Sequence, residues 1–241
     1  GVFMIYVTVP GDTVSSISRQ SGVPVWKIIY DNQLGEEGKL TVGQALLLLK
    51  PQESAEIRED LYVTGYAYPF NEPYVLEMAF PALNELLVFS YGFTFEGELV
   101  PPIQDETWMI QLAWENGIEP MLVLTPFTQG VFNNQLIQTL VEEESVRENV
   151  ITNLLKVVEE KGYVGVDVDF EYVRAQNREG YAEFVGELRA AMNEKGYRVS
   201  VALAPKTSSD QKGLLYEGID YALLGEQADR LFLMTYEWGY S

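Results

Sequence analysis

The chain has 241 residues, of which 47% are hydrophobic and 22% are charged, a composition typical of a globular protein with a sizeable core. Its 36 acidic and 16 basic residues give a net charge of −20, which disfavours nucleic-acid binding because a polyanion would be repelled. It contains no Cys and no His, so disulfides, thiol nucleophiles and mechanisms with a histidine base are excluded, and carboxylates and tyrosines must carry any proton transfer.

Residues 1–50 are predicted to form a small module of their own. A short strand over 5–9 leads into turn-forming residues, two short helices follow, and an apolar strand over 45–49 ends the module. The predicted order is strand, helix, helix, strand. A polar, acidic connector at 51–60 indicates a domain boundary, which leaves 61–241 as the second domain.

The residues of this module resemble the LysM family. The resemblance is carried by Tyr6, Val7, Val9, Gly11, Asp12, Thr13, Ile17, Gly22, Asn32, Leu34, Leu40, Gly43, Gln44 and Leu46. It implies binding to N-acetylglucosamine-containing chains such as peptidoglycan or chitin, between the loops at 11–14 and 32–35. The implied glycan-binding residues are Gly11, Asp12, Thr13, Asn32 and Leu34. The alternative is that Gly11, Asp12 and Thr13 only form a turn and a helix cap.

Beyond residue 60, strands and helices alternate. Strands are predicted at 61–68, 86–94, 119–126, 163–172, 197–205 and 231–236, and helices at 106–116, 145–161 and 178–195. This alternation predicts an α/β fold with a parallel sheet and helical crossovers. An eight-unit barrel needs about 250 residues. We therefore expect a (β/α)8 TIM barrel that is truncated after its sixth strand, preceded by the βααβ module.

Three carboxylates share one face of the predicted fourth strand. Asp167, Asp169 and Glu171 alternate with apolar residues, so the carboxylates point into the barrel, with Glu171 nearest the carboxyl end of the strand. Active sites of (β/α) barrels lie at that end. Like charges this close should raise at least one pKa and leave a proton available to a general acid. A solvent-facing acidic strand and a Mg²⁺ or Ca²⁺ site remain alternatives.

This strand resembles the Asp-Gly-x-Asp-x-Asp-x-Glu signature of glycoside hydrolase family eighteen, the chitinase-like barrels. Gly165, Asp167, Asp169 and Glu171 match it, whereas Val164 replaces the first Asp. Because that position lies farthest from the acid, we expect the replacement to tune the site rather than change its mechanism. The family's Met-x-Tyr-Asp motif is matched at residues 234–237, with Glu in place of Asp.

The resemblance implies a role for each matching residue. Glu171 would act as acid and then as base, Asp169 would orient the substrate acetamido group, and Asp167 would hold and tune Asp169. Tyr236 would donate a hydrogen bond to the acetamido oxygen, which attacks the anomeric carbon. The remaining implied substrate contacts are Tyr66, Phe89, Met234, Glu237 and Trp238. Tyr66 and Phe89 are as readily explained as core or rim residues.

The order of a LysM module and this barrel resembles that of spore cortex-lytic N-acetylglucosaminidases. It implies a glycoside hydrolase that cleaves N-acetylglucosamine linkages in peptidoglycan by a retaining, substrate-assisted mechanism, without metal or cofactor. The expected partner is a peptidoglycan or chitin-like glycan, not nucleic acid or membrane. The expected location is the spore coat, cortex or cell wall, although no signal peptide is visible. A glycan-binding lectin without activity and a wall-anchoring protein are the competing hypotheses.

Overall fold

The computed structural model describes residues 3–35, 38–49, 61–128 and 131–235. The chain divides into two compact units, residues 1–58 and 59–241. The predicted connector at 51–60 lies outside the described residues. Among the helices of the described residues, none has the length and apolar character needed to cross a membrane.

The first unit has the predicted order of strand, helix, helix and strand. β1 (Phe3–Val7) pairs antiparallel with β2 (Ala45–Leu49), and α1 (Val14–Ser21) and α2 (Val25–Asp31) lie between them in the chain. The apolar positions of these elements form a separate core made of Val14, Ile17, Val23, Ile28, Leu46 and Leu48. The unit therefore has a hydrophobic core of its own.

The second unit is built on six parallel strands that lie beside one another in chain order. The strands are β3 (Thr64–Ala67), β4 (Glu85–Phe93), β6 (Glu119–Leu124), β9 (Gly165–Val168), β10 (Arg198–Leu203) and β11 (Arg230–Leu233). Each strand pairs in parallel with the next. The sheet also curls: the Tyr66 ring on β3 lies 5.4 Å from the Phe232 ring on β11. The structure is thus a curled parallel half-barrel, which confirms the predicted fold class at that level.

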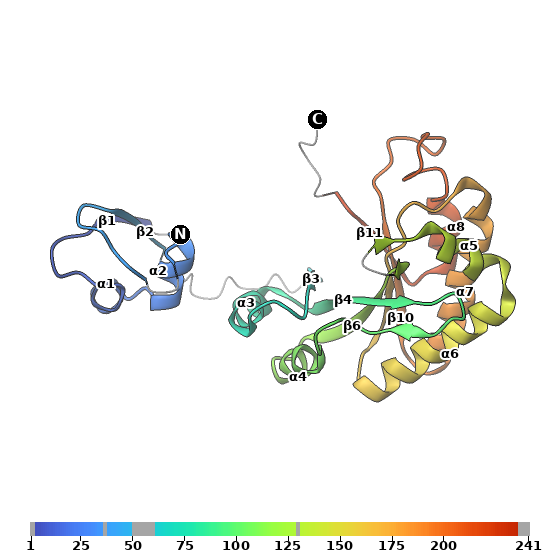
Figure 1. Cartoon of the computed structure of the whole chain (residues 1–241), viewed down its shortest axis with the longest axis horizontal. Coiled ribbons are helices and arrows are strands. Elements are labelled where there is room, and N and C mark those ends of the chain that lie inside the picture. Colours follow the sequence, from blue (N-terminus) through green and yellow to red (C-terminus); the bar gives the residue numbers. More distant parts are fainter. Residues whose placement is uncertain (1–2, 36–37, 50–60, 129–130, 236–241) are drawn as a thin grey trace. The chain divides into compact units, whose positions relative to one another are not determined.

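Helical crossovers cover the outer face of this sheet. The helices are α3 (Pro73–Ala79), η1 (Phe80–Ala82), α4 (Thr107–Glu115), α5 (Asn134–Glu142), α6 (Glu144–Lys161), η2 (Ala175–Asn177), α7 (Arg178–Glu194) and α8 (Tyr221–Gln227). Their apolar faces and the outward side chains of the strands form one large core. Helices α5 to α8 lie together on one side of this unit (Figure 1). This core holds the sheet from its outer face and leaves the inner face to position a site.

Several short elements were not predicted. Besides α3, α5 and α8, these are β5 (Leu99–Val100), which pairs antiparallel with β4, and the pair β7 (Phe127–Thr128) and β8 (Val131–Phe132). The predicted strands over 163–172 and 231–236 were too long, since β9 ends at Val168 and β11 at Leu233. Directly past these ends, the backbone N–H of Asp169 still donates to the carbonyl oxygen of Leu124, and that of Met234 to the carbonyl oxygen of Leu203.

An ionic network occupies the amino-terminal end of the inner face. The buried carboxylate of Glu85 accepts hydrogen bonds from Arg198 at 3.1 Å and from Arg230 at 2.6 Å. Arg198 also donates to Glu119 at 2.6 Å, and the Arg230 guanidinium lies 5.0 Å from the centre of the Tyr62 ring. These groups come from the first residues of their strands or just before them. They fill the floor of the half-barrel and leave its opposite end, where the strands finish, for chemistry.

Candidate active site

Asp167 is completely buried on the inner face of β9, between two hydroxyl groups. Tyr66 on β3 donates a hydrogen bond to its Oδ2 at 2.7 Å, and Ser200 on β10 donates a very short one to its Oδ1. Burial raises the pKa of Asp167, and the two hydrogen bonds oppose that rise without cancelling it. Asp167 is therefore held by hydroxyls of the neighbouring strand β10 and of β3 across the half-barrel, and its burial disfavours the charged form.

Asp169 follows the last residue of β9 and is 7% exposed. Burial, the nearby charge of Asp167 and then that of Glu171 raise its pKa to about 7. Its Oδ1 is buried and has no hydrogen-bond partner among the described residues. A carboxyl group that is half protonated near neutral pH, with one oxygen unsatisfied, is suited to receive a polar group of a ligand.

Glu171 lies two residues farther along, partly buried, where the chain leaves the sheet. The next residue, Tyr172, has a φ of 59°, which places it in the left-handed region that non-glycine residues rarely occupy. This sharp turn ends the extended segment directly after Glu171. The three carboxylates thus step from the buried interior to the mouth of the half-barrel, with Glu171 outermost, as their spacing predicts.

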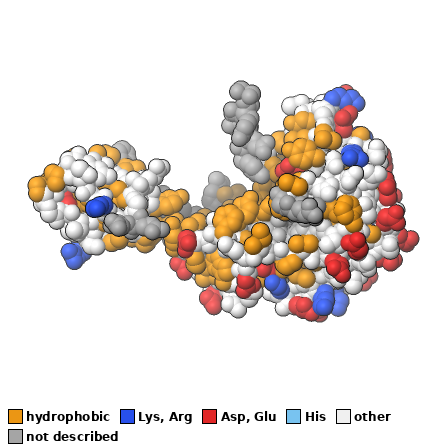
Figure 2. All heavy atoms as spheres, in the orientation of Figure 1, with side chains coloured by type: hydrophobic (Ala, Val, Ile, Leu, Met, Phe, Trp, Pro, Cys, Tyr) orange, Lys and Arg blue, Asp and Glu red, His pale blue; other side chains and the backbone are white. Residues whose placement is uncertain are grey.

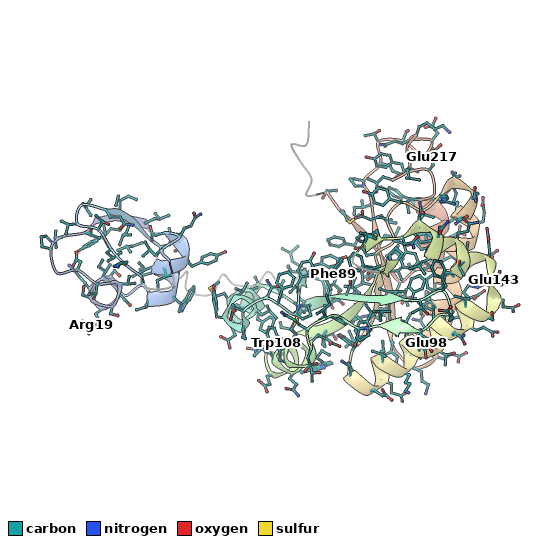
Figure 3. All side chains as sticks on the ribbon, viewed as in Figure 1. Arg19, Phe89, Glu98, Trp108, Glu143 and Glu217 are labelled. Carbon is teal, nitrogen blue, oxygen red and sulfur yellow. The ribbon has the colours of Figure 1, made fainter. Side chains whose placement is uncertain are left out.

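The aromatic residues predicted to line the site have different positions. The Tyr66 hydroxyl is bonded to Asp167, so Tyr66 supports the carboxylates from the interior. Phe89, on β4 and labelled in Figure 3, is partly buried, and its ring lies 5.0 Å from the ring of Tyr68, which stacks on Phe70 at 4.8 Å. Phe70 is 64% exposed. Phe89 thus joins an aromatic cluster with two exposed residues, Tyr68 and Phe70, that were not predicted from the sequence.

Two residues near the carboxylates, Tyr68 and Ser200, were not predicted from the sequence. Tyr68 comes directly after the end of β3, two positions after Tyr66, and the alternation along the predicted strand at 61–68 could have pointed to it. Ser200 lies directly opposite Asp167 in the pairing of β10 with β9. Only the register of two distant strands reveals this pairing, and no local pattern could have identified Ser200.

Two further motif positions can be placed. Val164 packs with the apolar cluster of the inner face that includes Leu87, Met121 and Val123. A carboxylate at 164 would meet these apolar side chains, which agrees with its replacement by valine. Met234 is buried against small residues of β10. The predicted contacts Tyr236, Glu237 and Trp238 lie outside the described residues.

The first unit has a groove of about 430 Å³, which is lined by the first predicted binding loop and by residues 38–40, not by the second predicted loop at 32–35. Asp12 and Thr13 line it, but both side chains also have structural partners: Asp12 accepts hydrogen bonds from Tyr6 and from the backbone of Val9, and Thr13 caps α1. Gly11 has a φ of 90°, a conformation that favours glycine. These three residues therefore form the turn that shapes the groove, whether or not they touch a ligand.

Asn32 and Leu34 lie away from the lining of this groove. The amide of Asn32 donates to the carbonyl oxygens of Ile28 and Leu47 and accepts from the backbone N–H of Leu47. It joins the end of α2 to β2. Leu34 packs against the core of the unit. In this structure both residues hold the second loop in place, and the groove is lined instead by neighbours such as Lys39 and Leu40.

Metal binding was an alternative explanation of the carboxylate strand. Within the described part of the chain, no group of three or more His, Cys, Asp or Glu side chains is arranged to hold a metal ion. Asp167 is instead occupied by two hydroxyl donors.

We expect Asp169→Asn to make the protein more stable than the wild type at pH 8. Because the pKa of Asp169 is about 7, the folded state keeps a proton that the unfolded chain releases near the ordinary value. The stability that this protonated carboxyl contributes is complete below about pH 4 and is lost, at roughly 1.4 kcal/mol per pH unit, as the pH rises to 7. Asparagine is neutral throughout and avoids that loss.

Urea unfolding of both proteins at pH 4 and pH 8 measures this effect. The variant's advantage should be present at pH 8 and absent at pH 4. An advantage of equal size at both values would show that Asp169 does not hold a proton in the folded protein.

Comparison with known proteins gives two family matches. Residues 130–240 match the model of glycosyl hydrolases family 18, and residues 6–48 match that of the LysM domain. The chain is 32% identical to the cortical fragment-lytic enzyme of Bacillus subtilis, over 98% of this chain and 66% of that protein. It is 31% identical to the protein of the same name from Bacillus anthracis, over 95% of this chain and 65% of that protein.

Solved structures agree with these matches. The spore cortex-lytic enzyme SleL of Bacillus megaterium superposes with a TM-score of 0.70 and 27% identity, over 98% of this chain and 55% of that structure. A chitinase from Chromobacterium violaceum, at 21% identity and a TM-score of 0.68, covers 75% of this chain and 57% of that structure and supports the fold alone. The chain thus spans about two thirds of the length of the curated relatives and about half of these structures.

Proposed function

We propose that this chain, whose residues 6–48 match the LysM domain and whose residues 130–240 match glycosyl hydrolases family 18, hydrolyses N-acetylglucosamine linkages in bacterial peptidoglycan, with the spore cortex as its substrate. The observation that carries the proposal is the stepped row of Asp167, Asp169 and Glu171 at the carboxyl end of β9. The similarity to cortical fragment-lytic enzymes supports peptidoglycan over chitin. The same similarity supports a location outside the cytoplasm, in the spore coat, cortex or wall.

The proposed mechanism retains the anomeric configuration and uses the substrate's own acetamido group. Glu171, at the mouth, protonates the glycosidic oxygen while the acetamido oxygen attacks the anomeric carbon. Asp169 accepts a hydrogen bond from the acetamido N–H, which increases the negative charge on the attacking oxygen. Glu171 then removes a proton from the water that opens the intermediate, and the proton balance is restored.

The electrostatics support this division of roles. Asp167 is held by Tyr66 and Ser200 and stays close to Asp169, whose pKa its charge helps to raise. With a pKa of about 7, Asp169 can be neutral in the free protein and charged when the intermediate carries positive charge. Tyr236 would complete the site by donating to the acetamido oxygen.

Release of soluble fragments from purified spore peptidoglycan, together with turnover of a fluorogenic N-acetylglucosaminide, tests the proposed function. Both reactions are expected with the wild-type protein. Binding to peptidoglycan without turnover of either substrate would contradict the enzyme and favour the lectin hypothesis. Neither binding nor turnover would favour a structural role in the wall.

The first unit is expected to bind glycan by itself, because it has its own core and a groove between its loops. Calorimetry of a fragment containing residues 1–50 with chitooligosaccharides or soluble peptidoglycan should show binding. Ser15, which lines the groove, offers a blocking variant: Ser15→Trp should abolish binding. Gln20→Trp, on the exposed face of the same helix, is the matched control and should leave it intact. Equal binding by both variants would place the ligand elsewhere.

A further inference from the structure

A lysine ammonium lies at the centre of the loop that connects β10 with α8, residues 204–220. Lys206 Nζ donates hydrogen bonds to three backbone carbonyl oxygens of this loop, at 3.1 Å to Ser209, 3.2 Å to Tyr216 and 2.7 Å to Ile219. An ammonium group has three N–H donors, so these carbonyls use all of them. One side chain therefore joins three points of the loop that are separated in sequence.

The start of the loop is fastened to the first residue of α8. The Tyr221 hydroxyl donates to the carbonyl oxygen of Ala204 at 2.6 Å and accepts the backbone N–H of Lys206 at 2.9 Å. The Lys206 ammonium also lies 5.9 Å from the centre of the Tyr221 ring. The lysine is thus fixed at its backbone as well as at its charged end.

The far end of the loop is fastened beside the candidate active site. Arg178 of α7 donates to the carbonyl oxygen of Glu217, which is labelled in Figure 3, at 3.0 Å through Nε and 2.6 Å through Nη2. Gly218 packs so closely that a Cβ on it would lie 2.1 Å from the carbonyl oxygen of Val173. Val173 is two residues after Glu171, so the loop packs directly against the segment that carries the proposed acid.

Two side chains of the loop lie over the inner face of the half-barrel. Leu215 and Tyr216 are partly buried against a small cluster that includes Ala202. Ala202 is two residues after Ser200 on β10, and side chains two apart on a strand share a face. Leu215 and Tyr216 therefore cover the same face from which Ser200 bonds Asp167, closer to the mouth.

We propose that Lys206 is a positioning residue that holds Leu215 and Tyr216 as one wall of the sugar-binding site at the mouth of the half-barrel. This proposal rests on the proposed function, because it takes the ligand of the half-barrel to be a sugar chain. Apolar and aromatic side chains at such a site pack against the apolar face of a pyranose ring. Lys206 itself lies behind the wall, with its donors engaged by backbone, and touches no reacting atom. Its removal should loosen binding of the glycan much more than the chemical step.

The kinetic test compares Lys206→Met with Lys212→Met on a soluble peptidoglycan tetrasaccharide. Lys212 is the matched control: it is on the same loop, its side chain is 86% exposed, and it pairs with Glu217 at 3.3 Å. Lys206→Met should raise KM about tenfold, equivalent to about 1.4 kcal/mol of binding, with kcat changed less than about twofold. Lys212→Met should match the wild type. Equal kinetics for the two variants, or a loss confined to kcat, would overturn the proposal.

A second variant separates loss of the ammonium from misfolding. Because the chain has no cysteine, Lys206→Cys introduces a single thiol, and alkylation with 2-bromoethylamine rebuilds a side chain of lysine length with a terminal ammonium. KM should rise in the unmodified variant and return to the wild-type value after alkylation. If alkylation restores the ammonium but not KM, the three carbonyl contacts do not position the wall.

Binding can be followed without turnover in the Glu171→Gln protein labelled with ¹⁵N. Addition of the tetrasaccharide should shift the amide signals of Leu215 and Tyr216, and this shift should be lost when Lys206→Met is added. Turnover by the wild type without these shifts would contradict the wall and leave the proposed function intact. Shifts without wild-type turnover would contradict the function and leave the wall intact. Absence of both would contradict both.

Discussion

Glu171→Gln should reduce kcat on peptidoglycan fragments to near background while leaving their binding unchanged. Glutamine has the shape of glutamate and most of its hydrogen bonds, but it cannot deliver a proton. Loss of a general acid alone typically costs about 10²–10⁴-fold in rate, and in the proposed mechanism the same residue must also serve as base. We therefore expect a loss at the upper end of that range or beyond it. Steady-state kinetics together with calorimetry on the same tetrasaccharide measure both quantities.

The matched control is Glu183→Gln, which makes the same chemical change on the exposed face of α7. It should retain wild-type kcat and wild-type stability to urea. Wild-type kcat in Glu171→Gln would remove Glu171 from the role of acid. A loss of binding in parallel with kcat would instead indicate that Glu171 holds the substrate rather than protonating it.

Removal of the substrate's N-acetyl group is expected to have an effect of similar size. If the acetamido oxygen is the nucleophile, a glycan with a free amine at that position lacks the attacking atom, and no side chain in the proposed mechanism replaces it. We expect its hydrolysis to be slower by at least about 10²-fold. This factor is smaller than the rate advantage that a well-oriented intramolecular nucleophile can provide. Rates on acetylated and chemically deacetylated glycan of the same length give the comparison.

Competition between the two glycans provides the control for this comparison. The deacetylated glycan should still inhibit cleavage of the acetylated one, since the proposed active site of the half-barrel would contact the rest of each sugar. Inhibition with no turnover would agree with the assisted mechanism. Equal rates on both glycans would require an enzyme nucleophile, for which Asp169 would be the nearest candidate.

The barrel is strongly acidic, and the charge is unevenly distributed along the chain. Acidic side chains gather over the α5–α6 side of the second unit (Figure 2). Such a surface repels anionic polymers at low ionic strength and is screened by salt. Contacts with a peptidoglycan chain are therefore expected to depend on shape and hydrogen bonding more than on overall charge.

Much of the fold could be predicted because its local signals agree with one another. The six parallel strands alternate with long amphipathic helices such as α6, in which Val146, Val150 and Leu154 form one buried face. The seven-residue helices α3 and α8 were missed because two turns carry too little periodicity. The ends of β9 and β11 were misplaced because the extended pattern of side chains continues past the last ladder hydrogen bond.

The site was predictable to the extent that it lies within one segment. The alternation at 167, 169 and 171 is local, and it placed three carboxylates in a row that the structure brings together at the carboxyl end of β9. The partners of Asp167 could not be found in this way. Tyr66 and Ser200 lie on strands distant in sequence, and only the curl and register of the sheet bring their hydroxyls to one carboxylate. The role of Lys206 could not be predicted either, because its three carbonyl partners are brought together only by the fold of the loop.

The most direct measurement of the proposed mechanism is the anomeric configuration of the first product. Proton NMR recorded during the first minutes of hydrolysis, before mutarotation, resolves the two anomers of the newly released reducing end. Attack by the acetamido oxygen followed by attack of water inverts the anomeric carbon twice, so the β-anomer of a β-linked substrate should appear first. Initial formation of the α-anomer would mean that water attacks directly, and it would contradict the assignment of Glu171 and Asp169 to a substrate-assisted site.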